Sequence, residues 1–452
     1  MKIVQVAHSF LPHTKAGTEV YTYVLSRALS GKNEVSVFFR VKNSRKKEYA
    51  VTEGACDGFK TFAINHTFSQ CRCFEQTYED KRIDEAFARL LDAIKPDCVH
   101  IQHLLFLSLG IVREAKKRGI PVVCTLNDYW LICHKGQFIK DDLSVCQRYD
   151  ASSCQACLLS QLSIRGNAMR FYTILRKTVP NMLLQFIKRA YIKKTTSGDR
   201  REAWLDRMLL EREEAIQELI GKTDLFISPT DFMRNKFIAF GVPAEKITLL
   251  PHGIPRASDS TDKSGSRSLR FGFIGTLLPM KGIDILIDAF KQIKNRNVEL
   301  LIFGKLLPYA GYEGYMHVLR KTAGKDSRIR LMGDFDHKEA GKVFSGLDVL
   351  VVPSIWPENW PLVIAEAFLY KTPVVASRIG GIPELIEDGK NGLLFNAGDA
   401  HDLKDKLQRF IDDRPLLDAL KNTVTKVKTI EEHAIEIEQI YAWLIEKSLA
   451  VA

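Results

Sequence analysis

Two glutamates stand on either side of a turn in the segment Pro357–Ala367, which reads PENWPLVIAEA. Glu358 precedes an expected helix and Glu366 lies within it. A carboxylate accepts two hydrogen bonds at once, so it suits the vicinal hydroxyls of a ribose or a hexose. Backbone amides near the N-terminus of that helix are placed to meet phosphate oxygens, except at Pro361, which has no N–H. The residues expected at this site are Glu358, Asn359, Trp360, Pro361, Leu362, Val363 and Glu366.

Either glutamate alone has a plainer explanation. Glu358 would be an ordinary negative charge at a helix N-terminus, and Glu366 the partner of a lysine. The whole string, with both carboxylates around one turn, favours a ligand site over that explanation.

The elements that must hold this segment read as strands and helices of an α/β fold. Short apolar, β-branched runs alternate with helical patterns, and many runs are apolar at consecutive positions, as in strands buried on both faces of a parallel sheet. The predicted strands are Lys2–Ala7, Glu34–Phe39, Asp97–Gln102, Pro121–Leu126, Asp224–Ser228, Lys246–Leu250, Leu269–Ile274, Val298–Phe303, Arg328–Met332, Asp348–Val352 and Thr372–Ala376. The alternation predicts doubly wound α/β domains.

A polar segment, Arg256–Ser268, separates the two series of strands and reads as a linker because it has almost no apolar residue. We therefore expect an N-terminal domain over residues 1–255 and a C-terminal domain over 269–430. A last helix over 431–452 is expected to pack back on the N-terminal domain. Ligands of such sheets bind outside the carboxyl ends of the strands, which predicts a site in a cleft that the two domains face.

An insert at about 133–221 interrupts the pattern. Its first part is irregular and contains Cys133, Cys146, Cys154 and Cys157, the last two as a Cys-x2-Cys pair. Two readings stay open for these cysteines, a structural zinc site or free thiols in a reducing compartment. Its second part reads as helical, and Arg165–Arg201 holds ten basic residues and one acidic residue among apolar ones. That stretch predicts either docking on an anionic membrane or a solvated basic face.

The formal charge of +11 indicates an anionic partner: nucleic acid, an acidic membrane or a phosphate-bearing substrate. The chain has no basic sheet with interleaved aromatic residues and no recognition-helix pattern, so we expect no nucleic acid. A strand pattern starts directly at Lys2, and no apolar run reaches the length of about 20 residues that a spanning helix needs. We expect a cytoplasmic protein, peripheral on the inner face of the membrane if the basic stretch docks there.

Several motifs, in this order along the chain, resemble those of the retaining family-4 glycosyltransferases, which share the GT-B fold. The resemblance covers nearly the whole chain outside the insert. Its elements are Lys15–Glu19 (KAGTE), Ile227–Thr230 (ISPT), Leu250–Ile254 (LPHGI), Phe273–Gly282 (FIGTLLPMKG), the two glutamates Glu358 and Glu366 with seven residues between them, Gly380–Glu384 (GGIPE) and Asn391–Phe395 (NGLLF).

The resemblance implies two Rossmann-like domains that face each other across a cleft. It implies transfer of a hexose from a UDP- or GDP-sugar to a hydroxyl of a glycan or lipid-linked acceptor in cell-surface polysaccharide or lipid-linked glycan assembly. No cofactor or metal ion would be required, because Lys281 would neutralise the leaving diphosphate. Glu366 would hold the ribose and Glu358 a hydroxyl of the transferred sugar. Gly275 would belong to the phosphate-binding turn, and Gly17 would let the ligand approach the backbone.

Two positions depart from the family pattern. Thr276 stands where the family often has an arginine, and Asn127 stands where it often has a histidine. His103, at the end of the preceding strand, and Asp128 are further candidates for the catalytic site. The departures motivate an alternative, a non-catalytic nucleotide-sugar-binding relative. An epimerase or a sugar phosphorylase on the same fold is a second alternative, but the chain lacks the lysine context of a pyridoxal phosphate site.

Overall fold

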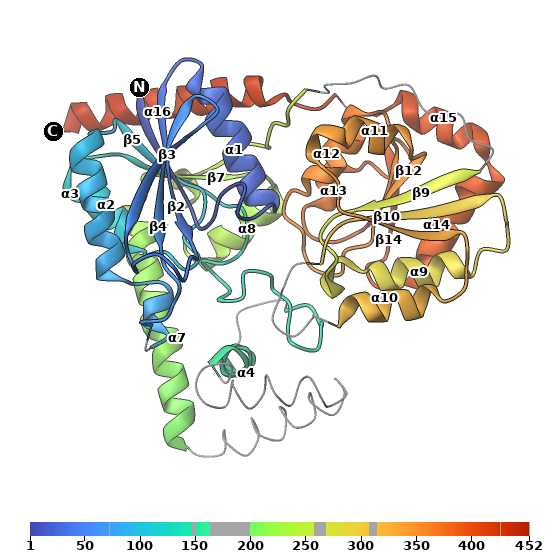
Figure 1. The fold of residues 1–452 in the computed structure, drawn as a ribbon, viewed down its shortest axis with the longest axis horizontal. Coiled ribbons are helices and arrows are strands. Elements are labelled where there is room, and N and C mark those ends of the chain that lie inside the picture. Colours follow the sequence, from blue (N-terminus) through green and yellow to red (C-terminus); the bar gives the residue numbers. More distant parts are fainter. Residues whose placement is uncertain are drawn as a thin grey trace. The chain divides into compact units, whose positions relative to one another are not determined.

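The computed structural model describes residues 1–71, 73–146, 151–162, 199–256, 268–306, 314–424 and 426–451. The chain forms two compact units (Figure 1). The first unit consists of Met1–Ile227, Lys236–Thr248 and Glu438–Ala452, and the second of Ser228–Asn235 and Leu249–Ile437. Residues 257–267 of the predicted linker and residues 165–198 of the basic stretch lie outside the described residues.

The first unit contains an eight-stranded sheet with the order β3-β4-β2-β1-β5-β6-β7-β8. The strands are β1 (Lys2–Ala7), β2 (Glu34–Val41), β3 (Val51–Cys56), β4 (Phe59–Asn65), β5 (Cys98–Ile101), β6 (Val122–Thr125), β7 (Leu225–Ser228) and β8 (Ile247–Leu249). Of the pairs with a defined register, only β3–β4 is antiparallel. The order of the parallel strands reverses between β1 and β5, so this sheet has a topological switch point there.

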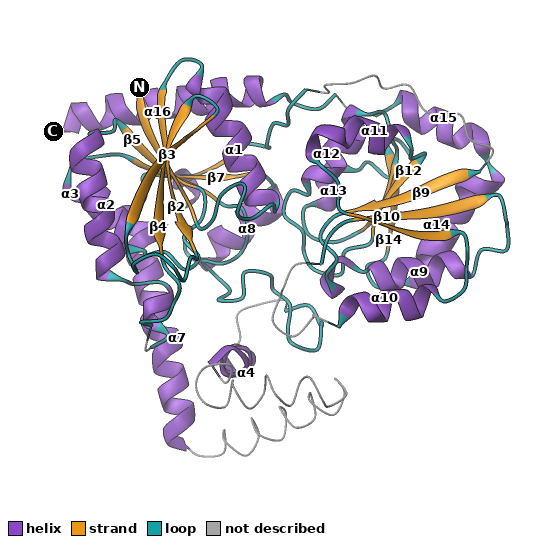
Figure 2. Ribbon diagram, viewed as in Figure 1, coloured by secondary structure: helices purple, strands orange, loops and turns teal. Residues whose placement is uncertain are grey.

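Helices cover both faces of this sheet (Figure 2). They are α1 (Gly17–Ser30), α2 (Lys81–Ile94), α3 (Gly110–Lys117), α7 (Asp199–Lys222) and α8 (Asp231–Phe240), with the short 3-10 helices η1 (Glu75–Thr77) and η2 (Ala244–Lys246). Helix α4 (Ala151–Leu162) contacts α7 and lies away from the sheet. Local chemistry sets their ends. For example, the Asp80 carboxylate accepts the Arg82 amide at the start of α2, and Lys95 ends that helix in the left-handed region with φ of 48°.

The second unit contains a six-stranded sheet with the order β11-β10-β9-β12-β13-β14, and every pair is parallel. Its strands are β9 (Leu269–Ile274), β10 (Val298–Phe303), β11 (Ile329–Gly333), β12 (Val349–Val352), β13 (Val374–Ser377) and β14 (Gly392–Phe395). In sequence order this is 3-2-1-4-5-6, the order of dinucleotide-binding folds, with the switch point between β9 and β12.

Apolar residues bury both faces of the second sheet. In β12, Val349 and Val351 belong to one hydrophobic cluster, whereas Leu350 and Val352 belong to the other. A strand can serve two cores in this way because successive side chains point to opposite faces. The helices are α9 (Ile283–Lys291), α10 (Tyr315–Ala323), α11 (Ala340–Ser345), α12 (Leu362–Leu369), α13 (Ile382–Leu385), α14 (Ala400–Asp412) and α15 (Arg414–Asn422), with the 3-10 helices η3 (Pro279–Lys281) and η4 (His337–Glu339).

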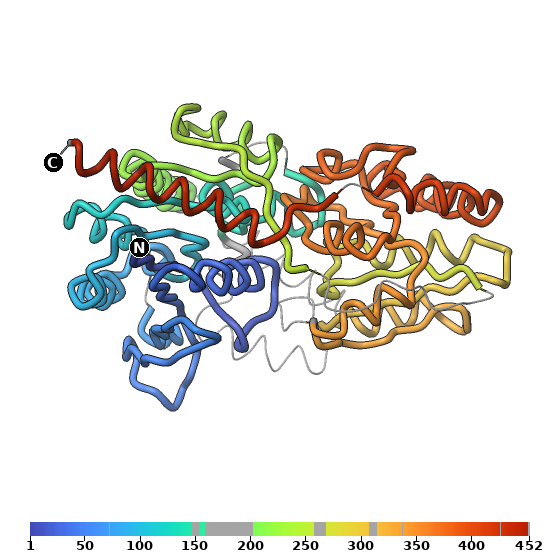
Figure 3. The backbone as a smooth tube through the Cα atoms, turned by 90° about the horizontal axis from the view of Figure 1, so that it is seen from above, coloured from blue at the N-terminus to red at the C-terminus, as the bar shows by residue number. Residues whose placement is uncertain are grey.

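The C-terminal helix α16 (Ile430–Val451) contributes residues from Glu438 onward to the first unit (Figure 3). Tyr441 on this helix is fully buried, and its hydroxyl lies 2.5 Å from Nδ1 of His100 and accepts a hydrogen bond from the Gln5 amide at 3.3 Å. Within the described part of the chain, no helix combines the length and the apolar character needed to cross a membrane.

All the predicted strands are present, with ends that differ by at most two residues. Three strands were not predicted: β3, β4 and β14. The cysteine-rich segment was predicted to be irregular as far as Cys157, and this is wrong at its end, because α4 begins at Ala151 and contains both Cys154 and Cys157.

Candidate functional site

The carboxyl edge of the second sheet brings two oppositely charged side chains together at the switch point. Lys281 follows β9 at the end of η3, and Glu358 follows β12, the neighbouring strand. Nζ of Lys281 lies 2.6 Å from Oε1 of Glu358. The ends of adjacent parallel strands meet at one edge, so residues 77 positions apart in the chain form a direct ion pair.

Two neutral donors complete the surroundings of the Glu358 carboxylate. The Ser354 hydroxyl donates to Oε1 at 2.6 Å and the Trp356 indole N–H donates to the same oxygen at 2.8 Å. Glu358 is only 5% exposed, whereas the Lys281 side chain is 26% exposed. The buried carboxylate is thus held in place, and the ammonium keeps a face open to a ligand.

Glycine turns lock the two loops that carry this pair. Gly282 has φ of +67°, and a Cβ there would lie 1.9 Å from the carbonyl oxygen of Pro353. The Ile355 amide donates to the carbonyl of Met280 at 2.9 Å, which joins the same two loops. Gly275 has φ of +157°, and a Cβ on Gly304 would lie 1.9 Å from the carbonyl oxygen of Gly275. Glycine at 304, after β10, therefore lets that loop approach the backbone of the predicted phosphate-binding turn at Gly275.

A third loop, after β13, packs against the backbone of the Glu358 segment. The Gly381 amide donates to the carbonyl of Glu358 at 2.7 Å, and a Cβ on Gly380 would lie 2.2 Å from that oxygen. Asn359 is buried, and its side-chain oxygen accepts a hydrogen bond from the Thr230 hydroxyl at 3.0 Å. The predicted ligand segment is thus fixed by contacts within the second unit.

Helix α12 begins at Leu362, directly after Pro361. Of the predicted backbone donors, Leu362 and Val363 therefore lie in its first turn, while Asn359 and Trp360 precede it. Glu366 lies on α12 and is partly exposed. The indole nitrogen of Trp360 is buried and has no hydrogen-bond partner among the described residues.

The carboxyl edge of the first sheet gathers a second group of polar residues. His8 follows β1, His103 follows β5, and Asn127 and Asp128 follow β6. β1 and β5 are the strands at the switch point of this sheet, and β6 is the next strand along. The three predicted candidates His103, Asn127 and Asp128 line one small pocket together with Gln102 and Trp130.

The hydrogen bonds of His103 define its tautomer. The Leu105 amide donates to Nδ1 at 3.0 Å, so Nδ1 is an acceptor and the neutral ring carries its proton on Nε2. Nε2 lies 2.9 Å from Oδ2 of Asp128, to which it donates. The other Asp128 oxygen accepts the Trp130 amide at 2.8 Å. His103 and Asp128 therefore form an oriented pair rather than two independent groups.

Asn127 is oriented by Gln102. Its side-chain amide donates to the backbone carbonyl of Gln102 at 2.9 Å and to the side-chain oxygen at 3.2 Å. Gln102 in turn donates to the Gln5 side chain at 2.8 Å. The side-chain amide N–H groups of Asn127 are thus engaged by Gln102. This leaves the side-chain carbonyl oxygen of Asn127 as the atom that a ligand would contact.

Two residues beside this pocket, the partly buried His8 and the fully buried Glu19, were not among the predicted site residues. Nε2 of His8 lies 3.3 Å from Oε1 of Glu19, and the rings of His8 and His103 have centroids 4.5 Å apart. Burial, and then the nearby His103 and Arg40, hold the pKa of His8 well below its usual value, and burial raises the pKa of Glu19. The position of His8 directly after a strand was the available signal, as was the place of Glu19 next to Gly17.

Gly17 is the first residue of α1. Apart from Gly17 itself, its chain neighbours and the backbone of its own helix, no described atom lies within 4 Å of where its Cβ would be. The space above the start of this helix is therefore open, as an approaching ligand would require.

The predicted zinc site receives no support. All nine cysteines lie in the described residues and none forms a disulfide. No group of three or more His, Cys, Asp or Glu side chains in that part of the chain could hold a metal ion, which includes Cys133, Cys146, Cys154 and Cys157. Burial raises the pKa of the Cys157 thiol to about 12.

The fold and the two polar edges define a class: two Rossmann-like α/β units, each with polar side chains at its switch point. Comparison with known proteins agrees. The model of Glycosyltransferase Family 4 matches residues 16–157, and that of Glycosyl transferases group 1 matches residues 260–427. Together the two models cover more than half of the chain. The chain belongs to the group 1, family-4 glycosyltransferases.

Individual relatives match over part of their length. An uncharacterised glycosyltransferase of Methanocaldococcus jannaschii is 33% identical over 171 residues, which cover 38% of this chain and 43% of that protein. The D-inositol 3-phosphate glycosyltransferase of Corynebacterium glutamicum is 27% identical over 245 residues, 50% of this chain and 56% of that protein. The chain spans about half the length of the curated relatives it matches.

Solved structures match over nearly the whole chain and show the fold. HepE of Anabaena, in complex with UDP and glucose, matches with a TM-score of 0.65 at 16% identity, and the match covers 98% of this chain and 99% of the HepE chain. The lipopolysaccharide outer core galactosyltransferase WaaB matches with a TM-score of 0.59 at 14% identity, and the match covers 98% of this chain and 100% of the WaaB chain. These matches identify the two units as the Rossmann-like domains of the GT-B fold.

Proposed function

We propose that the protein is a retaining glycosyltransferase that moves a hexose from a UDP- or GDP-sugar to a hydroxyl acceptor. The observation that carries this proposal is the Lys281–Glu358 ion pair at the switch point of a 3-2-1-4-5-6 sheet. Switch points are where such sheets bind nucleotides, because the loops diverge there and leave backbone amides exposed. Membership of a glycosyltransferase family supports the same conclusion.

In this proposal the donor diphosphate lies against Lys281. An ammonium group has three N–H donors, so Lys281 can keep its bond to Glu358 and still donate to a phosphate oxygen. The amides at the start of α12 would meet the same phosphates, Glu366 the ribose hydroxyls, and Glu358 a hydroxyl of the sugar. Fixed positive charge at the departing diphosphate stabilises the transition state, which is why no divalent metal ion is required.

The chemical step breaks the bond between the anomeric carbon and the diphosphate oxygen. The acceptor hydroxyl forms the new bond on the same face, and its proton passes to the departing phosphate. The protein contributes orientation and charge stabilisation more than proton transfer.

The acceptor is proposed to bind at the pocket of the first unit. His103 and Asp128 form an oriented polar pair there, Asn127 presents a carbonyl oxygen, and Trp130 presents an aromatic ring. Together they suit the hydroxyls and the C–H face of a sugar. The names of the similar proteins WcaL, a putative colanic acid biosynthesis glycosyltransferase, and WaaB, a lipopolysaccharide outer core galactosyltransferase, support a glycan or lipid-linked acceptor in cell-surface polysaccharide assembly.

The test is a panel of UDP-, GDP- and ADP-sugars, scored for nucleotide release and for the shift in melting temperature. We expect at least one UDP- or GDP-sugar to stabilise the protein and to be turned over in the presence of a chelator. Failure of every nucleotide sugar to stabilise the protein would refute the proposal.

One alternative is a non-catalytic nucleotide-sugar binder. Two observations favour it: the amide donors of Asn127 are engaged by Gln102, and Thr276 supplies no second cation near Lys281. The same panel separates the two functions, because such a binder would be stabilised by a nucleotide sugar without releasing the nucleotide.

A further inference from the structure

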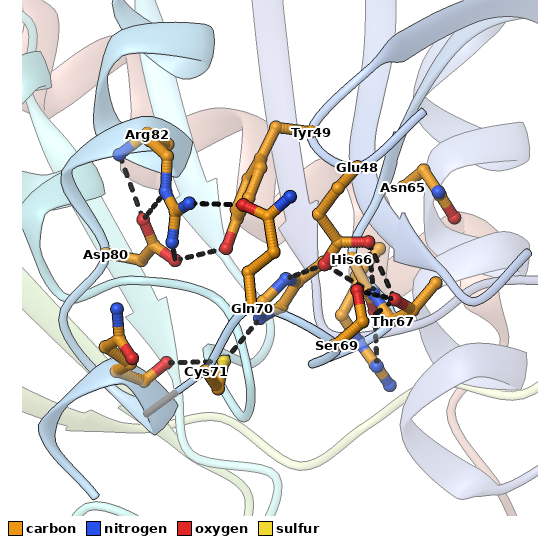
Figure 4. A network of polar contacts seen from close by, with 12 residues as sticks. Glu48, Tyr49, Asn65, His66, Thr67, Ser69, Gln70, Cys71, Asp80 and Arg82 are labelled. Atoms are coloured by element: carbon orange, nitrogen blue, oxygen red, sulfur yellow. Dashed lines mark hydrogen bonds and ion pairs between the residues drawn. The ribbon is translucent and has the colours of Figure 1, made fainter. Parts of the chain in front are cut away.

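A network of polar contacts lies between β4 and α2 in the first unit, and it uses none of the residues proposed to bind donor or acceptor (Figure 4). At its centre are a thiol, an imidazole and a carboxylate. Sγ of Cys71 lies 3.6 Å from Nε2 of His66, and Nδ1 of the same ring lies 2.8 Å from Oε1 of Glu48. A nucleophile, a base and a group that orients the base therefore occur in sequence.

The polarity of these contacts follows from Thr67. Its amide donates to both oxygens of Glu48 at 2.8 and 3.1 Å, and its hydroxyl donates to Oε2 at 2.7 Å. Although burial opposes the charge, these hydrogen bonds together with His66 hold the pKa of Glu48 below its usual value. The carboxylate accordingly accepts from Nδ1–H of His66. The lone pair on Nε2 is then left to face Cys71, whose thiol is the donor.

The imidazole is held so that this lone pair keeps its direction. His66 is fully buried, and its ring centroid lies 5.1 Å from that of Tyr49 and 4.4 Å from that of Phe68. Tyr49 is itself fixed, because its hydroxyl donates to Asp80 at 2.8 Å and the Arg82 guanidinium lies 4.1 Å above its ring. A base that a third group orients, within reach of a nucleophile, is the arrangement that activates nucleophiles in proteins.

A backbone carbonyl also lies near the thiol. The carbonyl oxygen of Gln76 lies 4.0 Å from Sγ of Cys71, a longer contact than the one to His66. Cys71 is partly exposed, so a small molecule can reach the sulfur while the base behind it stays dry.

We propose that Cys71 is a modification site at which His66, oriented by Glu48, activates the thiol toward low-molecular-weight disulfides. The thiol proton moves to Nε2 of His66 as Sγ forms a bond to one sulfur of the disulfide. The bond between the two sulfurs of the reagent breaks, and the departing thiolate takes the proton back from His66. The products are a mixed disulfide on Cys71 and one free small thiol, so atoms and electrons balance without another oxidant.

Cys73 provides an internal comparison. It lies two residues further along and is more exposed than Cys71. No hydrogen bond to the Cys73 sulfur occurs among the described residues. Exposure alone would make Cys73 the faster thiol, whereas base activation makes Cys71 the faster one.

The experiment treats the full-length protein with oxidised glutathione at pH 7 and quantifies the mixed disulfide on each cysteine by peptide mass spectrometry. We expect Cys71 to react at least about tenfold faster than Cys73. A positioned base typically accelerates a reaction about 100-fold, and we expect a smaller ratio here because Cys71 is less exposed than Cys73. His66→Gln should slow Cys71 at least about tenfold and leave Cys73 unchanged. Cys73→Ser, the matched control, should leave the rate at Cys71 unchanged.

Glu48→Gln gives a second route if the His66 variant does not fold. The amide still accepts from Thr67 but no longer carries the charge that orients and stabilises the imidazolium, so Cys71 should again slow while Cys73 does not. The proposal is overturned if Cys71 reacts no faster than Cys73 in the parent protein, or if neither His66→Gln nor Glu48→Gln changes its rate.

Discussion

Replacing Lys281 with methionine removes the charge of the buried ion pair and keeps most of the side-chain volume. At 2.6 Å and an effective dielectric constant of about 20, the gross attraction is about 6 kcal/mol. Desolvation offsets much of it, and removing one partner of a buried pair typically costs about 3–5 kcal/mol. We expect the low end, about 3 kcal/mol, because Ser354 and Trp356 still donate to Glu358 and the lysine is a quarter exposed.

Differential scanning fluorimetry measures this loss. For a domain of this size, 1 kcal/mol corresponds to about 2–4 °C, so the melting temperature should fall by about 6–12 °C. Lys390→Met is the matched control. Lys390 also forms an ion pair with a glutamate, Glu387, at 2.8 Å, but the side chains of Lys390 and Glu387 are both mostly exposed. An exposed pair contributes about 0–1 kcal/mol, and the control should lower the melting temperature by less than about 4 °C.

A double variant completes the cycle. Glu358→Gln in the Lys281→Met background removes the unpaired buried charge, so it should restore more than half of the lost stability. The reasoning is refuted if Lys281→Met lowers the melting temperature no more than Lys390→Met does. It is also refuted if the stability losses of the single variants Lys281→Met and Glu358→Gln add up to that of the double variant.

Three further outcomes are expected. Glu366→Ala should lower turnover more than tenfold, about 1.4 kcal/mol, while the protein stays folded; unchanged turnover on the true donor would remove Glu366 from the site. Asn127→Ala should lose about 1–3 kcal/mol of transition-state stabilisation, measured as kcat/KM, while Asn127→His should stay within about tenfold of the parent. If instead the parent transfers no sugar and Asn127→His creates transfer, the protein is a binder. The stability of Glu19→Gln relative to the parent should rise as the pH rises above the ordinary glutamate pKa of about 4.3, because a carboxyl group with a raised pKa in the folded state loses its favourable contribution there. A difference in melting temperature that does not change with pH would contradict the raised pKa of Glu19.

Most of the fold followed from the sequence because consecutive apolar positions mark strands that are buried on both faces. β3 and β4 escaped this criterion, since β3 is an exposed edge strand. Their hairpin did carry a local signal: Asp57 and Gly58 form the connection with φ of 38° and 94°, and an Asp-Gly pair is typical of such turns. β14 was assigned only to a closing motif of the family, although its four residues are all buried.

The candidate site was predictable in its parts but not in its contacts. The rule that ligands bind at the carboxyl ends of strands placed Lys281 and Glu358 at one edge. No spacing could reveal that they bind each other, because they lie 77 residues apart and meet only through the order of the strands. The burial of Glu19 was equally hidden, since it depends on how α1 packs on the sheet.

The central claim is that a nucleotide-diphosphate sugar binds at the switch point of the second unit, against Lys281. Isothermal titration of UDP- and GDP-sugars into the parent protein, Lys281→Met and Lys390→Met tests it most directly. We expect the parent to bind at least one donor, Lys281→Met to bind it about tenfold more weakly or worse, and Lys390→Met to bind as the parent does. Binding that is unaffected by Lys281→Met, or weakened equally by both lysine changes, would contradict the claim.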